Sequence, residues 1–466
     1  MARSWKIAAW MVGWLGVTWP LQAQTPPPPV PVAPSSIGGM LAYPIAQPGP
    51  GPMGPGPMGP GPMGQWKPPV PGAGPRPPMP PMPPGAQPPE GEKGDLSLDA
   101  KSVSHNAFNS DAGGDYIPIA HEFRLEYLVL WFKSHTHPIL VTSGNSFDPI
   151  PGALDQPGTT ILHGERSGPG ASSALRVTYT YWLVDPEIVS LDCSFMIMEQ
   201  RRLPFIAVSD SAGNPVITRP FFNPTASAED ADPRALPFVM RGQVEDSFMT
   251  RLMGAEANIK YNCTGRPCAE GPSFSLFVGP RWIKLDEYYA NRDFSQDIPS
   301  GTGETRRFED NVTCYNEFIG GQIGATFRCR WDRLTFDLTN KIAVGQNFQT
   351  LKASGRTVIS NDATGEVTST NEGLYVQSTN SGVDRFEHIS VVPQVDVTIG
   401  IALSDNCRFT VGYGFFNMNN VVRPGALLDR RIEIQAPGIP TTLPERRFNT
   451  TDFWAQWVSL GLELSY

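Results

Sequence analysis

Charged residues of both signs recur at alternate positions within segments that are otherwise apolar. Successive side chains of a β-strand point to opposite faces, so these charges would share the face opposite the apolar residues. Because an isolated charge in a dry interior is very costly, a closed sheet would have to pair or hydrate them. We therefore interpret them as the lining of a barrel lumen, either an ion-selective pore or a salt-bridged plug. The ten residues are Arg124, Glu126, Glu256, Lys260, Arg281, Asp337, Lys341, Asp396, Arg408 and Glu463.

Histidines are the second group of residues that could carry chemistry. His135 and His137 would share a face of an extended segment, where imidazoles could bind zinc or copper. Two histidines without a third ligand are a weak indication of a metal. A barrel enzyme would need a nucleophile, a histidine base and an orienting group at one rim, and His163 and His388 are the other loop candidates. None lies in a motif such as Gly-x-Ser-x-Gly, so we expect no catalytic residue, no metal and no cofactor.

The chain contains six cysteines. An even number in an exported protein is compatible with disulfides. Cys263 and Cys268 have four residues between them, and no second cysteine or histidine pair follows that would complete a zinc site. We therefore predict a local Cys263–Cys268 bridge. A second bridge could join Cys329 and Cys407, which would lie in neighbouring turns.

The last segment of the chain is the clearest structural signal. From Phe453 to Tyr466 apolar residues recur at every second position and the chain ends on an aromatic residue. The closing strand of a bacterial outer-membrane barrel has this pattern, with alternate residues in lipid and an aromatic residue at the interface. A buried edge strand of a soluble sandwich is the alternative. We expect Leu460, Leu462, Leu464 and Tyr466 to form the strand that the outer-membrane barrel assembly machinery engages.

The composition fits a protein that crosses a membrane with strands. Of the 466 residues 40% are hydrophobic, and the mean hydropathy is −0.23. Beyond the N-terminus no run approaches the roughly 18–20 apolar residues of a transmembrane helix, whereas a strand faces lipid only at alternate residues. The formal net charge is −9 without a Lys/Arg block. This argues against a nucleic-acid partner, which needs clustered positive charge.

The N-terminus carries the marks of export. Arg3 and Lys6 precede the apolar run Ile7–Trp19, and a small residue, Ala23, follows shortly after. The pattern predicts a signal peptide over residues 1–23 that is cleaved after Ala23. A retained helical anchor is the alternative, but Pro20 breaks the run early.

A proline-rich region separates the signal from the folded part. Residues 24–118 predict a proline/glycine-rich disordered linker, and Gly51–Gly64 repeats every five residues, which excludes collagen. Proline favours extended chain, so this region is a semi-rigid tether. It could be a spacer, or it could bind a cell-wall or envelope partner. The remaining residues, 119–466, predict the barrel.

The order of strands and loops predicts the topology. Roughly ten alternating segments are separated by connections that are short and long in turn. The short ones lie near 185–187, 263–271, 329–331 and 404–406, and the long ones near 133–174, 200–250, 288–313, 347–388 and 417–450. This is typical of a transmembrane antiparallel up-and-down barrel with short periplasmic turns and long extracellular loops. A further hairpin from 347–357 and 366–376 would raise the strand count to twelve.

Several short motifs occur in order along the predicted barrel. They are Glu126-Tyr127-Leu128 with Trp131, Gly254–Asn258, Gly279-Pro280-Arg281 with Leu285-Asp286-Glu287, Asn316–Gly324, Val411-Gly412-Tyr413, and Val421–Gly425 with Asp429. Together they resemble the outer-membrane β-barrel porins that are abundant in planctomycete bacteria, over residues 122–466. The resemblance implies an outer-membrane barrel of porin type with no assigned substrate.

The expected function depends on the width of the barrel. About eight strands leave room only for side chains, whereas aqueous porins have about 16–18. About ten strands therefore predict a lumen that is narrow or shut. Our leading hypothesis is a narrow channel for small solutes, surrounded by lipid in the outer membrane of a bacterium with two membranes. The alternative is a plugged barrel with a structural or surface-interaction role through its long outer loops, and a barrel enzyme comes third.

Overall fold

The computed structural model describes residues 121–183, 188–264, 271–299, 303–433 and 442–466. The chain divides into two units, Met1–Lys93 and Gly94–Tyr466, and every described residue belongs to the second. The predicted signal peptide, the predicted linker, the turn at 185–187 and Cys268 lie outside the described residues.

The described residues are almost entirely β-strands. The strands are β1 (His121–Phe132), β2 (His135–Ser143), β3 (Thr160–Ser167), β4 (Ser172–Trp182), β5 (Val189–Met198), β6 (Arg201–Val208), β7 (Ile217–Asn223), β8 (Ala228–Ala235), β9 (Met240–Asn262), β10 (Gly271–Asp297), β11 (Glu304–Trp331), β12 (Leu334–Asn361), β13 (Val367–Thr370), β14 (Gly382–Ser404), β15 (Cys407–Val422) and β16 (Thr450–Ser465). A short 3-10 helix, η1 (Pro424–Leu427), follows β15. Within the described ranges no helix is long and apolar enough to span a membrane.

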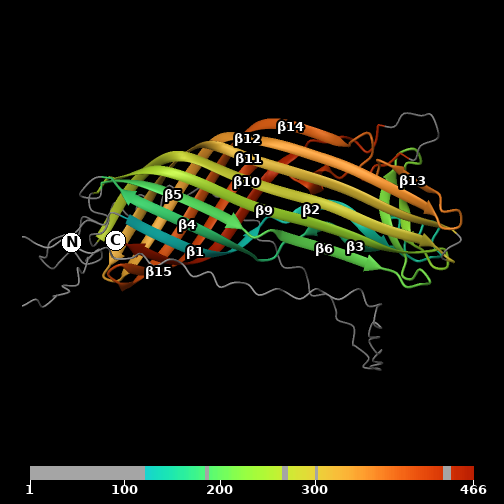
Figure 1. The fold of residues 1–466 in the computed structure, drawn as a ribbon, viewed down its shortest axis with the longest axis horizontal. Coiled ribbons are helices and arrows are strands. Elements are labelled where there is room, and N and C mark those ends of the chain that lie inside the picture. The colour runs from blue at the N-terminus through green and yellow to red at the C-terminus, as the bar shows by residue number, and fades with distance from the viewer. Residues whose placement is uncertain (1–120, 184–187, 265–270, 300–302, 434–441) are drawn as a thin grey trace, which may run out of the picture. The chain divides into compact units, whose positions relative to one another are not determined.

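Ten of these strands close into a ring (Figure 1). In order around the ring they are β1, β4, β5, β9, β10, β11, β12, β14, β15 and β16, which pairs again with β1; all pairs are antiparallel. Ring order follows chain order, as in an up-and-down barrel. The predicted all-β transmembrane-type barrel of about ten strands is confirmed. Strands β6 and β13 pair only with β9 and β12 outside the ring, and they bring the sheet to twelve strands.

One end of the ring has short connections between its strands. The fully described ones are Asp332–Arg333, between β11 and β12, and Asp405–Asn406, between β14 and β15. The C-terminus lies at this end, where His121 and Tyr466 exchange two backbone hydrogen bonds of 2.8 and 2.9 Å. We call this the short-turn end.

Strands β9 to β12 and β14 continue beyond the ring as a curved wall (Figure 1). We call this part of the structure, away from the short-turn end, the extended half, and these strands its wall. Strands β10, β11 and β12 have 27, 28 and 28 residues. Most of the segment expected to be a long loop at 288–313 is therefore strand. Its outward residues, such as Arg307 and Glu309, are exposed and polar, and a strand that faces water on that side resembles a loop in sequence.

The hairpin considered for residues 347–357 and 366–376 does not add strands to the ring. Residues 347–361 continue β12, and only Val367–Thr370 returns alongside it as β13. A separate four-stranded sheet, in the order β3-β2-β7-β8, fills the inward side of the wall. We call it the inner sheet. It shares one apolar core with the wall, including Leu140, Phe221, Phe248 and Tyr289.

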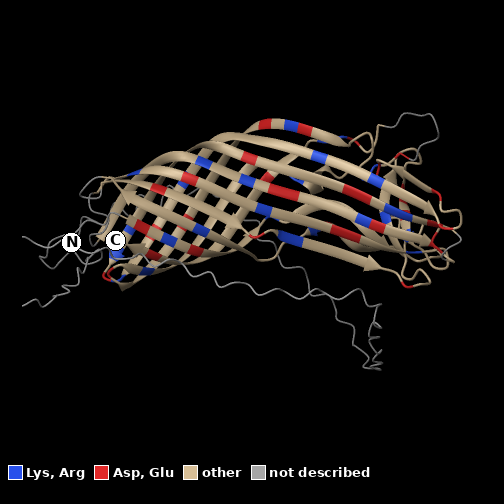
Figure 2. Cartoon of the chain, in the orientation of Figure 1, with Lys and Arg blue, Asp and Glu red and all other residues tan. Residues whose placement is uncertain are grey.

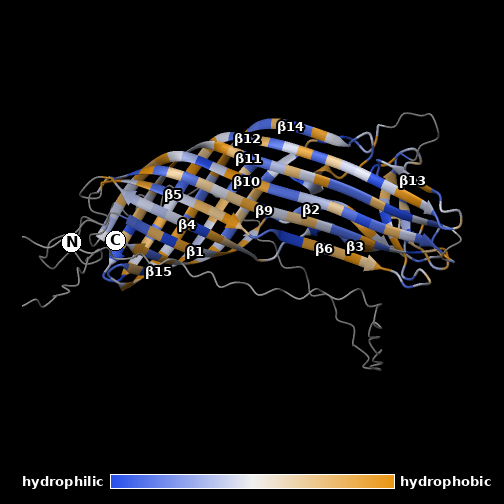
Figure 3. Cartoon of the chain, in the orientation of Figure 1, coloured by the Kyte–Doolittle hydropathy of each residue, from blue (hydrophilic) through white to orange (hydrophobic). Residues whose placement is uncertain are grey.

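The outside of the ring is an apolar belt. On β16, Val458, Leu460, Leu462 and Leu464 are 38%, 47%, 48% and 39% exposed, whereas Ser459 and Glu463 between them are 1% and 0% exposed. Figure 3 shows hydrophobic and hydrophilic residues alternating along the ring strands. On β1 the apolar outward residues run from Phe123 to Trp131, which at about 3.3 Å per residue and a tilt near 40° covers about 20 Å, close to the band of an outer-membrane barrel.

A charge placed on this belt should oppose membrane insertion. Leu460 lies opposite Tyr127 and Val411 in the middle of the paired strands. We expect Leu460→Arg to destabilise the folded barrel in liposomes by about 2–4 kcal/mol, the cost of a cation near the bilayer midplane. Reversible denaturant titrations in liposomes measure it. Asp405→Arg, in a turn at the short-turn end, is the matched control, and equal losses from both substitutions would contradict the belt.

Candidate functional site

The ring interior near the short-turn end is a charged layer. Figure 2 shows residues of both charge signs along the strands of the ring. Each of the ten charged residues selected from the sequence has a polar partner on another ring strand. Between neighbouring strands, Arg124 and Arg408 both bind Glu463, Arg176 binds Glu126 at 2.6 Å, Lys260 binds Asp192 at 2.7 Å, and Arg328 binds Asp337 at 2.7 Å. These pairs hydrogen-bond the lumen-facing charges to one another instead of leaving them to solvent.

Other contacts of the charged layer cross the lumen. Arg176 on β4 lies 3.1 Å from Asp396 on β14, and Lys341 on β12 lies 2.6 Å from Glu256 on β9. Neither pair of strands is adjacent in the ring. Arg281 on β10 likewise donates to Gln394 on β14. The charged layer therefore ties opposite walls together. Nearer the short-turn end a cavity of about 140 Å³ remains, room for on the order of ten waters.

Next along the lumen lies an apolar layer. Its inward side chains are Leu128, Leu130, Phe132, Ala174, Met198, Leu252, Ile283, Leu285, Phe318, Ala343, Val392, Phe416, Met418, Val421, Phe453, Ala455 and Trp457, all buried. The ring of Trp457 fits against Gly414, where an added Cβ would lie 2.3 Å from the indole. A ten-stranded ring is little wider than the eight-stranded barrels that side chains fill completely. The lumen is closed at this level by packed side chains.

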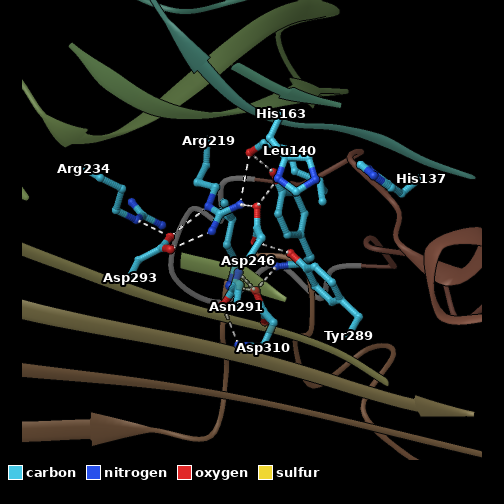
Figure 4. Close-up of polar contacts among 12 residues, drawn as sticks. His137, Leu140, His163, Arg219, Arg234, Asp246, Tyr289, Asn291, Asp293 and Asp310 are labelled. Carbon is cyan, nitrogen blue, oxygen red and sulfur yellow. Dashed lines mark hydrogen bonds and ion pairs between the residues drawn. The ribbon is translucent and has the colours of Figure 1, made fainter. Parts of the chain in front are cut away.

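The inner sheet is fixed to the wall by a buried ionic cluster, which we call the clamp (Figure 4). Arg219 on β7 donates to Asp293 on β10 at 2.6 and 2.9 Å and to Asp246 on β9 at 2.9 Å. Arg234 on β8 donates to Asp293 at 2.9 Å, and the Tyr289 hydroxyl donates to Asp246 at 3.0 Å. All four ionic side chains have 0% exposure. The clamp therefore joins two sheets through charges that have no contact with water.

A second buried junction unites three of the motifs on which the resemblance rests. Arg423, which follows β15, donates to Glu287 on β10 at two distances of 2.8 Å. It also donates to the backbone oxygens of Lys133 and Ser134, between β1 and β2. Asn316 on β11 hydrogen-bonds both the N–H and the C=O of Val422 at 2.9 Å. The chain leaving β15 is thereby held across the inside of the barrel.

Loss of the Asn316 side-chain amide should loosen residues 419–428, the segment that includes the end of β15 and the 3-10 helix after it. Asn316→Leu leaves the N–H and C=O of Val422 without their partner, which should cost about 1–3 kcal/mol. Hydrogen exchange at residues 419–428, followed by mass spectrometry, measures the loss. Asn311→Leu, at an outward position of the same strand, should leave exchange unchanged. Slow exchange in both variants would show that Asn316 does not hold the segment.

The predicted loop histidines lie in strands. His135 and His137 are on β2, and both rings stack on Phe248 with centroids 4.9 and 4.8 Å away. Burial lowers the pKa of His135 and of His163 to about 4, although Glu287 and Asp246 act against the shift. Both imidazoles are therefore neutral at pH 7. Within the described ranges no three or more His, Cys, Asp or Glu side chains gather as a metal site.

The cysteines give one correction. Cys329 and Cys407 are unpaired thiols, and their strands, β11 and β15, are separated by β12 and β14 in the ring, so the bridge considered between them is wrong. The thiol of Cys263 is exposed. Because Cys268 lies outside the described residues, the Cys263–Cys268 bridge stays a prediction.

Sequence reasoning missed the clamp. Its residues come from β7, β8, β9 and β10. Strands β7 and β8 and the first part of β9, with Asp246, fall within the segment 200–250 that was interpreted as a loop. Charged residues among prolines and glycines usually mark a solvated loop. Around Arg234, the acidic residues Asp230 and Asp232 do not alternate with large apolar residues, so the segment does not show the pattern of a strand. No local pattern distinguishes Arg219 from a surface arginine.

One protein family and several solved structures are similar to this chain. The family model described as "Putative beta barrel porin-7 (BBP7)" matches residues 123–466. The structure of the outer membrane protease OmpT from Escherichia coli is similar at 9% identity and a TM-score of 0.37, over 77% of this chain and 100% of that one. The Pseudomonas putida toluene transporter TodX is similar at 7% identity and a TM-score of 0.19, over 78% of this chain and 93% of that one. A Pseudomonas aeruginosa FadL homologue is similar at 8% identity and a TM-score of 0.19, over 78% of this chain and 92% of that one. No curated protein matches the chain.

Proposed function

Because the chain belongs to the beta barrel porin-7 family, an outer-membrane barrel family, we propose that this barrel is closed and holds a packed domain at the cell surface. Its partners are then the outer-membrane lipid around the belt and the barrel assembly machinery at the closing strand. The extended half would bind extracellular molecules at the cell surface. A cell-wall or envelope partner of the proline-rich segment stays a proposal. No catalytic role is part of it.

The apolar layer is the observation that carries the proposal. Trp457 and Phe453 from β16, Phe416 from β15 and Leu252 from β9 are each 0–2% exposed inside the ring. Filling a lumen with apolar side chains excludes water and ions, because a dry apolar space offers them no hydrogen bonds. The clamp adds a second closure, since the inner sheet occupies the extended half. Both features favour the plugged barrel over the narrow channel.

The narrow channel is the second candidate, and one observation favours it. The charged layer surrounds a cavity of about 140 Å³ that holds water-sized space next to opposite charges such as Lys341 and Asp396. Conduction would need the apolar layer and the segment after β15 to move aside. Lys341→Glu should then change the ion selectivity of the open state.

The surface role requires that the extended half face outward. Short turns of outer-membrane barrels lie in the periplasm, so the tip of the extended half should be extracellular. An epitope inserted at Gly365, where an added Cβ would meet nothing within 4 Å, should bind antibody on intact cells. The same epitope at Asp405 should bind only after the outer membrane is opened. Labelling of the Asp405 insertion on intact cells would contradict the proposed orientation, and folding of both proteins is checked by heat-modifiable migration.

A further inference from the structure

Two histidines of the inner sheet converge on one hydroxyl. Nε2 of His137, on β2, lies 2.9 Å from Oγ of Ser167, and Nε2 of His163, on β3, lies 3.1 Å from the same oxygen. The two rings meet edge to face with centroids 5.0 Å apart. The strands β2 and β3 are paired neighbours, so the arrangement is built into the sheet.

The other nitrogen of each ring also has a defined neighbour. Nδ1 of His137 lies 2.9 Å from the backbone oxygen of Pro138. A carbonyl oxygen can only accept, so this Nδ1 carries the hydrogen and Nε2 of His137 is a lone-pair acceptor. Nδ1 of His163 lies 3.5 Å from Oδ2 of Asp246 in the clamp (Figure 4).

With neutral rings, these contacts cannot all be satisfied. The hydroxyl of Ser167 has one hydrogen, which His137 requires as an acceptor. If His163 carries its hydrogen on Nδ1, it faces Asp246 favourably, but its Nε2 lone pair faces the lone pairs of Oγ. If the hydrogen is on Nε2, the Nδ1 lone pair faces the Asp246 carboxylate. Each tautomer of His163 leaves one repulsive contact inside a buried cluster, which costs free energy.

We propose that His137 and His163 bind a transition-metal ion of the zinc or copper class through their Nε2 atoms, with Ser167 Oγ or water beside it. A cation between the two lone pairs removes the repulsion at Oγ. His163 then keeps its hydrogen on Nδ1 toward Asp246, the carboxylate–histidine–metal arrangement that orients metal-binding imidazoles. Imidazole nitrogen is a preferred ligand of both metals. This inference does not rest on the surface role of the barrel.

Two further features fit a metal at this place. Glu165 lies opposite His137 in the β2–β3 register and has a backbone φ of 65°, a conformation that non-glycine residues adopt at a cost and that concentrates at functional sites. Its exposed carboxylate could complete the ligand set by rotation. In addition, His137 contributes to the lining of a groove of about 470 Å³.

Metal binding by the full-length chain tests the proposal. The protein is purified without a histidine tag, stripped with chelator, and titrated with Zn²⁺ and Cu²⁺. We expect one ion per chain, with the affinity reduced at least about tenfold in His137→Gln and in His163→Gln, since even supporting residues around a metal typically contribute 10–100-fold. His388→Gln is the matched control, because His388 bonds Gln349 on the wall and should bind metal as the wild type does.

A second measurement keeps the test independent of variant folding. Electron paramagnetic resonance of the wild type with one Cu²⁺ should show coupling to two imidazole nitrogens. Binding that is absent, that is unchanged in both Gln variants, or that shows no nitrogen coupling would overturn the proposal. So would an imidazolium at His163 at pH 7 in the metal-free protein, observed by NMR, because protonation would remove the repulsion without a metal.

Discussion

Arg219→Met should release the inner sheet from the wall of the extended half. Arg219 is the link between Asp293 and Asp246, and all three side chains have 0% exposure. Removing one partner of a buried ion pair leaves uncompensated charge and typically costs about 3–5 kcal/mol. Arg234 still donates to Asp293 and Tyr289 still donates to Asp246, so the loss should fall mainly on the attachment of β7. Hydrogen exchange in peptides from β2 and β7 should accelerate, while the strands of the ring stay protected.

A solvent-exposed arginine on β6, the strand that pairs with β9, is the control for this experiment. Arg202 on β6 pairs with Glu245 at 3.3 Å, and its side chain is 51% exposed. Exposed pairs contribute about 0–1 kcal/mol, so Arg202→Met should leave exchange in β2 and β7 unchanged. If Arg219→Met behaves like Arg202→Met, the clamp does not hold the inner sheet. If the ring strands exchange faster as well, the two halves of the barrel unfold together.

Trp457→Ala should open a cavity in the apolar layer. Among the described residues Trp457 is the largest fully buried side chain. Phe416 lies beside it at a centroid distance of 6.2 Å, and the guanidinium of Arg176 lies 5.7 Å from its ring centre. Large-to-small substitutions of buried aromatic residues cost about 3–5 kcal/mol, because the surroundings fill the cavity only in part. The free energy of unfolding in detergent or liposomes measures the loss.

The same strand supplies the control for Trp457. Trp454 lies on the outward face and is partly exposed, so Trp454→Ala should cost clearly less. The cavity left in the Trp457→Ala barrel should also admit water to the apolar layer. The part of the lumen that excludes water between the charged layer and the extended half would then be shorter. Equal destabilisation by both substitutions would contradict a packed lumen.

Much of the ring could be predicted from its sequence because each strand separates two environments. Leu464 must face lipid and its neighbour Glu463 must face the interior, so a period of two was enough to place both. The same reasoning placed Arg124 and Lys341 on the inward face. The number of strands followed from the count of alternating segments, and the short connections indicated antiparallel neighbours.

The extended half could not be predicted in the same way. Its wall faces water outside and a packed sheet inside, so β11 carries Arg307 and Glu309 where lipid would require apolar residues. The clamp depends on four strands meeting in space, and the positions of Arg219, Asp246 and Asp293 in the chain do not reveal this. The same holds for His163, whose partner His137 is reached only through the pairing of β2 with β3.

Single-channel recording of the refolded, full-length wild type in a planar bilayer tests the closed lumen most directly. A barrel that migrates as a folded, heat-modifiable species should insert and give no conductance steps, because Trp457 and the apolar layer around it fill the ring. Discrete, reproducible steps from the wild type would contradict this account, and their size would show how wide a path the apolar layer leaves.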